Sequence, residues 1–194
     1  MAQEIEAKFR LDDVQRIRQA LLRQGAEYRQ TVMETNRYFD WLDGTLRQGD
    51  RGLRIRVAQP LDQAGQPAKD KSPKITITYK GARQPSQVKV RQEIEFRLDD
   101  ADAAGEMFQA LGLANTLTFQ KRRETWELDG CTVELDELPK IGRFLEIEGP
   151  SETCIGQVRA KLGLADTSVE HTPYLGLLCD YLRTHQLDSR DITF

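Results

Sequence analysis

The chain has 194 residues, enough for one domain with a substantial hydrophobic core. Charged residues make up 30% of it, yet the net charge is only −3, so no excess of positive charge points to a nucleic-acid partner. No apolar stretch reaches the length of a membrane span, and the N-terminus lacks the apolar core of a signal peptide. We therefore expect a soluble, cytoplasmic protein.

The first predicted element is a strand that contains Glu4-Ile5-Glu6, and a helix follows it. Asp12 and Asp13 can cap this helix, apolar residues then recur at helical spacing, and Gly25 can end it. The same arrangement recurs over residues 93–112: a Glu-Ile-Glu tripeptide comes first, then two aspartates, then apolar residues at helical spacing. A third Glu-Ile-Glu, at 146–148, precedes a helix capped by Ser151. We interpret these segments as copies of one strand-plus-helix unit.

Further strands are predicted where polar and apolar residues alternate, at 30–40, 53–57, 74–80, 117–128 and 132–136. Segment 58–73 is expected to be a flexible loop, and 184–194 a C-terminal tail. Another helix is predicted from Pro173, with Thr172 as its cap. The total of about eight strands and about four helices predicts a single domain, 1–194, of the α+β class with a mostly antiparallel sheet.

Alternation places charged residues on one face of this sheet and apolar residues on the other. The charged face would collect Glu4, Glu6, Lys8, Arg54, Arg56, Lys74, Lys80, Arg91, Glu93, Glu95, Lys121, Arg123, Glu134, Asp136, Glu146 and Glu148. An open sheet could expose this face to solvent. Alternatively, eight strands suffice to close a barrel with the charges inside and helices packed on the outside. The dominance of carboxylates, Arg and Lys, segregated strand by strand, favours the barrel.

A lumen with both signs of charge suits a polyphosphate with its divalent cation. Arg and Lys match phosphate oxygens, and carboxylates hold Mg²⁺ or Mn²⁺. Without a metal ion, the carboxylates would repel the phosphates. The charge pattern therefore favours a metal–phosphate ligand over a nucleic acid.

The segment Glu4-Ile5-Glu6-Ala7-Lys8 resembles the ExExK motif of the CYTH superfamily, the triphosphate tunnel metalloenzymes. The resemblance continues in the family's order over roughly residues 3–180, through Tyr38-Phe39-Asp40, Leu53-Arg54-Ile55-Arg56, Thr78-Tyr79-Lys80-Gly81, Arg91-Gln92-Glu93, Lys121-Arg122-Arg123, Leu135-Asp136-Glu137 and Phe144-Leu145-Glu146-Ile147-Glu148. The class IV adenylate cyclase branch gives the nearest match. The resemblance implies a closed eight-stranded antiparallel β-barrel, a tunnel that binds a triphosphate.

The resemblance also implies roles for individual residues. The expected metal ligands are Glu4, Glu6, Asp136, Glu146 and Glu148. The expected triphosphate-binding residues are Lys8, Arg54, Arg56, Lys80, Arg91, Lys121 and Arg123, with Lys89 an alternative to Arg91. Glu4, Glu6 and Lys8 are the expected catalytic residues, with Lys8 one candidate for the base. Any of these could instead form an ion pair between strands, above all Glu95 and Lys74.

The implied activity is that of a class IV adenylate cyclase, which converts ATP to cyclic AMP and pyrophosphate with Mg²⁺ or Mn²⁺. The alternative is a triphosphatase that hydrolyses thiamine triphosphate, inorganic tripolyphosphate or a nucleoside triphosphate. A non-catalytic binder of phosphorylated ligands is a third hypothesis, although simple anion binding has no use for Glu4 and Glu6. We expect a small-molecule triphosphate partner, no nucleic acid and no membrane; a homodimer is compatible with the resemblance.

The remaining candidate residues have no expected role in the site. Cys131, Cys154 and Cys179 are odd in number, widely spaced and form no metal-binding pair, so we expect reduced thiols. Trp41 and Trp126 are expected to pack in the core or at the rim.

Overall fold

The computed structural model describes residues 3–84 and 89–194, with side chains described for 5–82 and 91–194. These residues form nine strands and five helices. In chain order they are β1 (Gln3–Leu11), α1 (Val14–Arg23), β2 (Glu27–Asp40), α2 (Thr45–Gln48), β3 (Gly52–Pro60), β4 (Lys74–Gln84), β5 (Lys89–Leu98), α3 (Ala101–Ala110), β6 (Ala114–Leu128), β7 (Cys131–Leu138), β8 (Gly142–Glu148), α4 (Glu152–Lys161), α5 (Tyr174–Thr184) and β9 (Asp191–Ile192).

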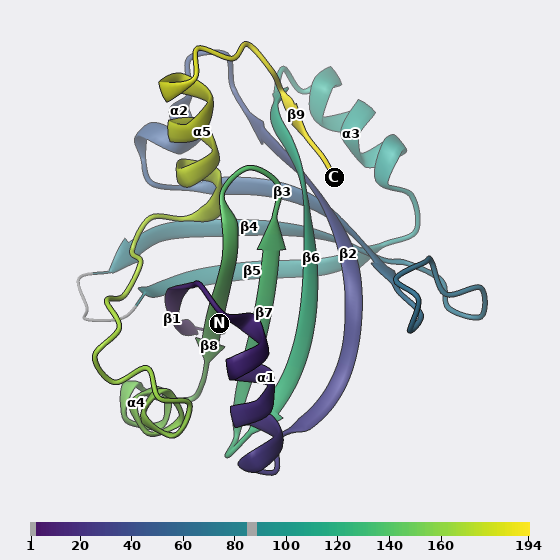
Figure 1. Ribbon diagram of the computed structural model, residues 1–194. Helices are drawn as coiled ribbons and strands as arrows, with labels where there is room; N and C mark the ends of the chain where they lie inside the picture. The colour runs from purple at the N-terminus through teal and green to yellow at the C-terminus, as the bar shows by residue number, and fades with distance from the viewer. Residues whose placement is uncertain (1–2, 85–88) are drawn as a thin grey trace.

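The first eight strands form a curled antiparallel sheet (Figure 1). The strand order is β2-β3-β4-β5-β1-β8-β7-β6, and β2 also pairs with β6 along most of its length, from Glu27 opposite Glu127 to Asp40 opposite Ala114. Strand β9 adds to β6 in parallel. The predicted α+β class with an antiparallel sheet of eight strands is confirmed.

The caps predicted for three helices are present. Asp13 accepts a hydrogen bond from the backbone of Arg16 at the start of α1, and Asp100 does the same for the first turn of α3. Ser151 accepts from the backbone of Cys154 at the start of α4. Each side chain satisfies backbone N–H groups that a helix start leaves without partners. The cap predicted for α5 is wrong, because Pro173 occupies that position and no side chain caps the helix.

Helices cover the outer, apolar face of the sheet. Phe9 of β1 and Val133 of β7 are fully buried in one cluster with Leu21 of α1 and Val158 of α4. A second cluster lies between α3 and strands β2 to β4. A third cluster packs α5 and β9 against Phe119 and Phe144, which alternate with the strand residues of the outer face and so lie on the inner one. Charged side chains of the opposite face, among them Lys8, Arg54 and Lys121, are buried as well, which argues against the alternative of a solvent-facing charged surface.

Three segments differ from the sequence predictions. Residues 58–60 belong to β3, so the predicted loop begins only at Leu61. The predicted tail 184–194 contains β9, which adds to the edge of β6. Helix α2 was not predicted, because four residues are too short to show a helical period; Asp40 accepts hydrogen bonds from the backbone of Leu46 and Arg47 within it.

No helix in the described part of the chain is long and apolar enough to cross a membrane.

Candidate functional site

A cavity of about 940 Å³ lies inside the curled sheet. All eight antiparallel strands contribute to its lining, together with the start of α5. It contains most of the residues predicted for the site, namely Glu6, Lys8, Arg54, Arg56, Lys80, Arg91, Lys121, Arg123, Glu146 and Glu148. The side chain of Glu4 lies outside the described ones, as does that of Lys89. The tertiary structure thus gathers residues from β1 to β8 around one space.

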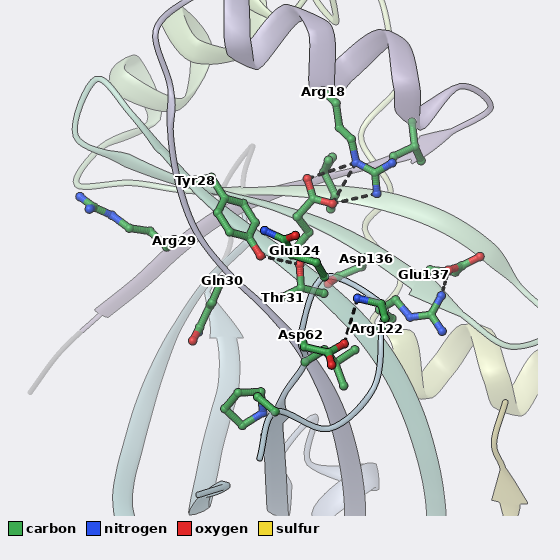
Figure 2. A pocket seen from close by; sticks show the side chains of 18 of the residues that line it. Arg18, Tyr28, Arg29, Gln30, Thr31, Asp62, Arg122, Glu124, Asp136 and Glu137 are labelled. Atoms are coloured by element: carbon green, nitrogen blue, oxygen red, sulfur yellow. Dashed lines mark hydrogen bonds and ion pairs between the residues drawn. The ribbon is translucent and has the colours of Figure 1, made fainter. Parts of the chain in front are cut away.

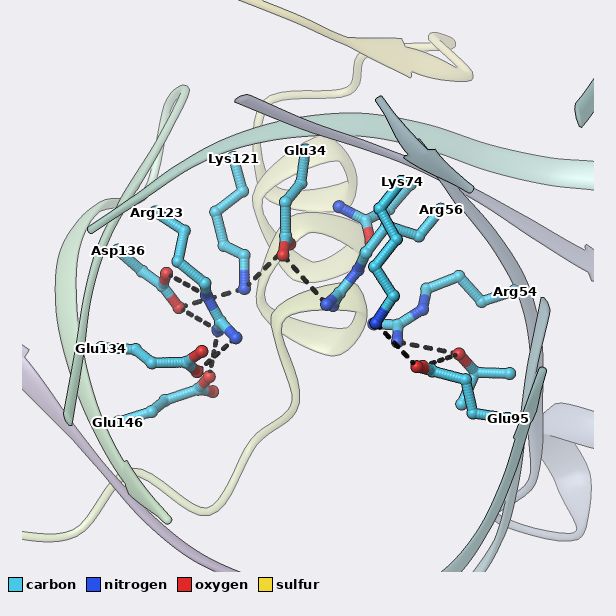
Figure 3. A network of polar contacts seen from close by, with 12 residues as sticks. Glu34, Arg54, Arg56, Lys74, Glu95, Lys121, Arg123, Glu134, Asp136 and Glu146 are labelled. Atoms are coloured by element: carbon cyan, nitrogen blue, oxygen red, sulfur yellow. Dashed lines mark hydrogen bonds and ion pairs between the residues drawn. The ribbon is translucent and has the colours of Figure 1, made fainter. Parts of the chain in front are cut away.

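Arg123 is the centre of the acidic side of this cavity (Figure 3). Its guanidinium donates to both carboxylate oxygens of Asp136, over 2.7 and 2.6 Å, and to Glu146 Oε2 over 2.5 Å. It also forms an ion pair with Glu134. Burial opposes its charge, but Asp136, Glu134 and Glu34 keep the pKa of Arg123 well above its usual value. One buried arginine therefore holds three carboxylates from β7 and β8 together.

Glu34 of β2 is a central residue that the sequence analysis missed. Its side chain is buried, lies 2.9 Å from Arg56 Nη1 and 3.3 Å from Lys121 Nζ, and faces the same network. Burial opposes its ionisation, but the positive charges of Arg56, Lys121 and Arg123 outweigh burial and lower the pKa of Glu34. The sequence carried a signal, because Glu34 is a charged residue in the predicted strand 30–40 and shares the face of Asn36, which the structure places at the cavity.

Helix α5 contributes its first residues to one side of the cavity, and in Figure 3 it lies behind the network. Lys8 Nζ donates to the carbonyl of Thr172 over 2.5 Å and lies 4.3 Å from the centre of the Tyr174 ring. The Tyr174 hydroxyl donates to Asp136 over 2.9 Å. Burial raises the pKa of Tyr174, as do the charges of Asp136 and Glu146. The sequence analysis assigned neither Thr172 nor Tyr174 to the site.

Basic residues on β3 and β5 retain unused hydrogen-bonding capacity. Arg54 donates to Thr78 over 3.1 Å, and Arg91 donates to the carbonyl of Asp50 over 3.0 Å. However, Nε of both arginines and Nδ2 of Asn36 are buried without a hydrogen-bond partner among the described residues. Buried donors of this kind are costly unless they are satisfied. All three residues line the cavity, so an anionic ligand with several oxygens would supply the partners.

Some of the predicted ion pairs between strands are present as well. Lys74 lies 3.5 Å from Glu95, and Lys80 is paired with Glu93. The ion pair between Lys74 and Glu95 therefore explains why both positions are charged, through a structural role in the sheet.

The carboxylates of β1 and β8 have the chemistry that a divalent cation requires. Glu6 lies directly opposite Glu148, and Lys8 lies opposite Glu146. Two carboxylates in facing positions repel each other unless a cation lies between them, and oxygen ligands suit Mg²⁺ or Mn²⁺. Among the side chains that the structure describes, no three His, Cys, Asp or Glu are arranged to hold a metal ion. This set does not include Glu4.

A second, outer groove of about 1010 Å³ lies between α1, the start of β2, the loop after β3 and the outer face of β6 and β7 (Figure 2). Its arginines are committed to neighbouring carboxylates: Arg18 lies 2.8 Å from Glu124, and Arg122 lies 3.1 Å from Glu137. Of the predicted site residues, Asp136 borders this groove. Ten others line the inner cavity, which is therefore the candidate site.

Fold and site together define a class of protein: a small α+β domain whose curled antiparallel sheet surrounds a cavity dense in charges of both signs. The chain belongs to the CYTH domain family, whose profile matches residues 2–165. The resemblance seen in the sequence is confirmed.

Known proteins with similar sequences or structures agree with this assignment. The chain is 27% identical over 145 residues to "Putative adenylate cyclase MJ0240" of Methanocaldococcus jannaschii, which covers 75% of each chain. The solved structure of PH1012 from Pyrococcus horikoshii has a TM-score of 0.73 and 28% identity, over 89% of this chain and 97% of that one. The "putative adenylyl cyclase HpAC1" of Hippeastrum, which has a dominant triphosphatase activity, is 18% identical and shares the fold, with a TM-score of 0.67 over 91% of this chain and 95% of that one.

Proposed function

We propose that this protein is a metal-dependent enzyme that acts on a triphosphate inside a closed tunnel, and that its reaction is the conversion of ATP to cyclic AMP and pyrophosphate. The observation that carries the proposal is the cavity itself, in which buried basic residues from several strands surround one space and several donor atoms lack partners. The pairing of β2 with both β3 and β6 supports a sheet that closes around the substrate.

The basic residues are proposed to bind the phosphates. Arg54 and Arg91 each have a buried Nε without a partner, and guanidinium groups match phosphate oxygens in geometry and charge. Lys121 and Arg123, on the neighbouring wall, and Lys80 add positive charge to the same cavity. We assign Lys8 to phosphate binding rather than to the role of base, because its contacts with the Thr172 carbonyl and the Tyr174 ring are those of an ammonium group.

The proposed metal ligands are Glu6, Glu146 and Glu148, joined by Glu4. A bound Mg²⁺ or Mn²⁺ would neutralise the facing carboxylates and polarise a phosphoryl oxygen of the substrate. Asp136 was expected to be a ligand as well. Because both its oxygens already accept hydrogen bonds from Arg123, and Oδ2 also from Lys121 and Tyr174, we propose that it orients these residues instead.

In the cyclase reaction the 3′-hydroxyl of ATP attacks the α-phosphorus in line, and pyrophosphate is the leaving group. The residues of the chain fix the triphosphate so that this hydroxyl and the α-phosphorus lie close together. The positive side chains stabilise the charge that develops on the leaving pyrophosphate.

Hydrolysis of a triphosphate is the second candidate reaction. The same basic residues and the same metal ligands would bind the substrate, which could be inorganic tripolyphosphate, thiamine triphosphate or a nucleoside triphosphate. Water would be the nucleophile. The dominant triphosphatase activity described for HpAC1 favours retaining this candidate, although that protein shares only the fold with this chain.

One experiment separates these functions. Purified protein is incubated with ATP, tripolyphosphate or thiamine triphosphate, each with Mg²⁺ and with Mn²⁺, and the products are identified. Cyclic AMP with pyrophosphate supports the cyclase, whereas orthophosphate supports the triphosphatase. Tight binding without any product would identify a non-catalytic binder and refute both enzymatic proposals.

A cytoplasmic location and a homodimer stay predictions.

A further inference from the structure

The structure brings together two cysteines that the sequence places 23 residues apart. Cys131 is the first residue of β7, and Cys154 lies in the first turn of α4. Their sulfur atoms are 3.0 Å apart, and both are free thiols. The three cysteines are free thiols, as the sequence analysis expected, but nothing in the sequence indicated that two of them lie side by side.

The two thiols differ in their access to solvent. Cys131 is 1% exposed within the cluster beneath α1 and α4, whereas Cys154 is partly exposed and also contacts the carbonyl of Asp129. The backbone just before α4 passes close to Cys131, because a Cβ on Gly149 would lie 2.7 Å from its sulfur. Gly149 thus leaves the space in which the Cys131 thiol meets Cys154.

We propose that Cys131 and Cys154 form an oxidation site, which a peroxide converts to an intramolecular disulfide. The partly exposed Cys154 is oxidised first by hydrogen peroxide to a sulfenic acid, with release of one water molecule. The sulfur of Cys131 then attacks the sulfur of Cys154, and the hydroxyl group leaves with the Cys131 proton as a second water molecule. In sum, two thiols lose two electrons and two protons to one peroxide molecule.

The geometry favours this second step over reaction with another protein molecule. A disulfide has a sulfur–sulfur distance of about 2.05 Å, so the two atoms need to approach by only about 1 Å. Burial raises the pKa of Cys131 to about 12, as does its contact with Cys154, so that Cys131 stays a protonated thiol at neutral pH. Burial and protonation thus protect it from direct oxidation, and the 3.0 Å between the two sulfur atoms lets it act as the resolving thiol for its neighbour.

The bond would join the hairpin of β7 and β8 to α4. This hairpin carries Glu134, Asp136 and Glu146, the carboxylates held by Arg123. The disulfide would close a loop around the hairpin and restrict the unfolded chain. Oxidation is thus expected to stabilise the part of the fold that supports the acidic side of the cavity. This inference depends on the thiol geometry alone and does not require the proposed activity.

The test uses the full chain, reduced and then treated with a small excess of hydrogen peroxide. Three thiols should be titrated in denaturant before treatment and one after it. The intact mass should fall by about 2 Da, and digestion without reductant should yield one cross-linked peptide containing both cysteines. The oxidised form should melt roughly 5–10 °C higher, and a reductant should reverse the shift.

Cys154→Ser and Cys179→Ser are matched variants, since each removes one thiol. Cys179→Ser should form the bond as the wild type does, with no free thiol left, whereas Cys154→Ser should keep both of its thiols and show no rise in melting temperature. The proposal is overturned if the wild type forms intermolecular dimers or gains oxygen at Cys154 without losing two thiols. Equal thiol loss in Cys154→Ser would also contradict it.

Discussion

Tyr174 at the start of α5 donates a hydrogen bond to Asp136 Oδ2 over 2.9 Å, across 38 residues of sequence. Asp136 is the residue that Arg123 contacts through two nitrogen atoms, and its side chain is fully buried. This hydrogen bond, together with the positions of Lys8 and Lys121 over the Tyr174 ring, connects α5 to the charged network of the sheet. It makes the helix part of the site and leads to the first prediction.

Replacing Tyr174 with Phe should weaken that connection without removing the aromatic ring from the core. We expect the free energy of unfolding to fall by about 1–2 kcal/mol, because Asp136 loses one of its buried donors. Chemical denaturation measures this change. Tyr181→Phe on the same helix should change stability by less than about 0.5 kcal/mol, and an equal loss in both variants would contradict a specific role for Tyr174.

Removing the carboxylate charge of Glu6 should abolish most of the activity. If Glu6 holds the divalent cation together with Glu148, Glu6→Gln should lower kcat/KM by about 100-fold or more, and Glu4→Gln should behave alike. The assay is product formation over a range of Mg²⁺ and Mn²⁺ concentrations, with the melting temperature as a check on folding. Glu106→Gln, at an exposed position of α3, is the control. Wild-type turnover in Glu6→Gln would refute the metal assignment.

One arginine on the inner face of the sheet and one on the outer face provide a test of phosphate binding. Arg54→Met removes an inner guanidinium whose Nε lacks a partner, and should weaken binding of tripolyphosphate by about 10-fold or more. Arg122→Met removes a guanidinium from the outer groove, where it is paired with Glu137, and should change binding by less than about 2-fold. Titration calorimetry at fixed Mg²⁺ concentration measures both. Similar losses would indicate that the inner cavity is not the binding site.

Glu34 should stabilise the fold in a manner that depends on pH. Glu34→Gln removes the carboxylate that pairs with buried Arg56 and one of the two that pair with Lys121, which should cost about 3 kcal/mol at pH 7. The positive neighbours lower the pKa of Glu34 below its ordinary value of 4.5 in the folded state. Its contribution is therefore fully present above about pH 4.5 and declines as the pH falls further, by about 1.4 kcal/mol per unit.

Denaturation of the wild type and of Glu34→Gln at pH 7, 5 and 3.5 measures this dependence. The difference between the two proteins should be nearly constant from pH 7 to 5 and smaller at pH 3.5. A difference that grows on acidification would show that the charge of Glu34 is not what stabilises the fold.

Much of the architecture could be predicted because it is encoded locally. Alternation of charged and apolar residues marked the inner and outer faces of β1, β3 and β8, since side chains of a strand point to opposite faces in turn. Asp13, Asp100 and Ser151 marked three helix starts because a cap acts within three residues. The same alternation identified most of the charged residues that line the cavity.

Other features depend on which strands become neighbours, and short-range patterns carry no information about that. The ion pairs of Glu34 arise because β2 pairs with β3 and β6, which bring Arg56 and Lys121 to it. Likewise, Asp136 meets Tyr174, and Cys131 meets Cys154, only after the sheet has curled and the helices have packed on it. By itself, the sequence determined which charges face inward. The tertiary structure decided which of them are paired and which donors remain for a ligand, because pairing depends on distances between residues far apart in the chain.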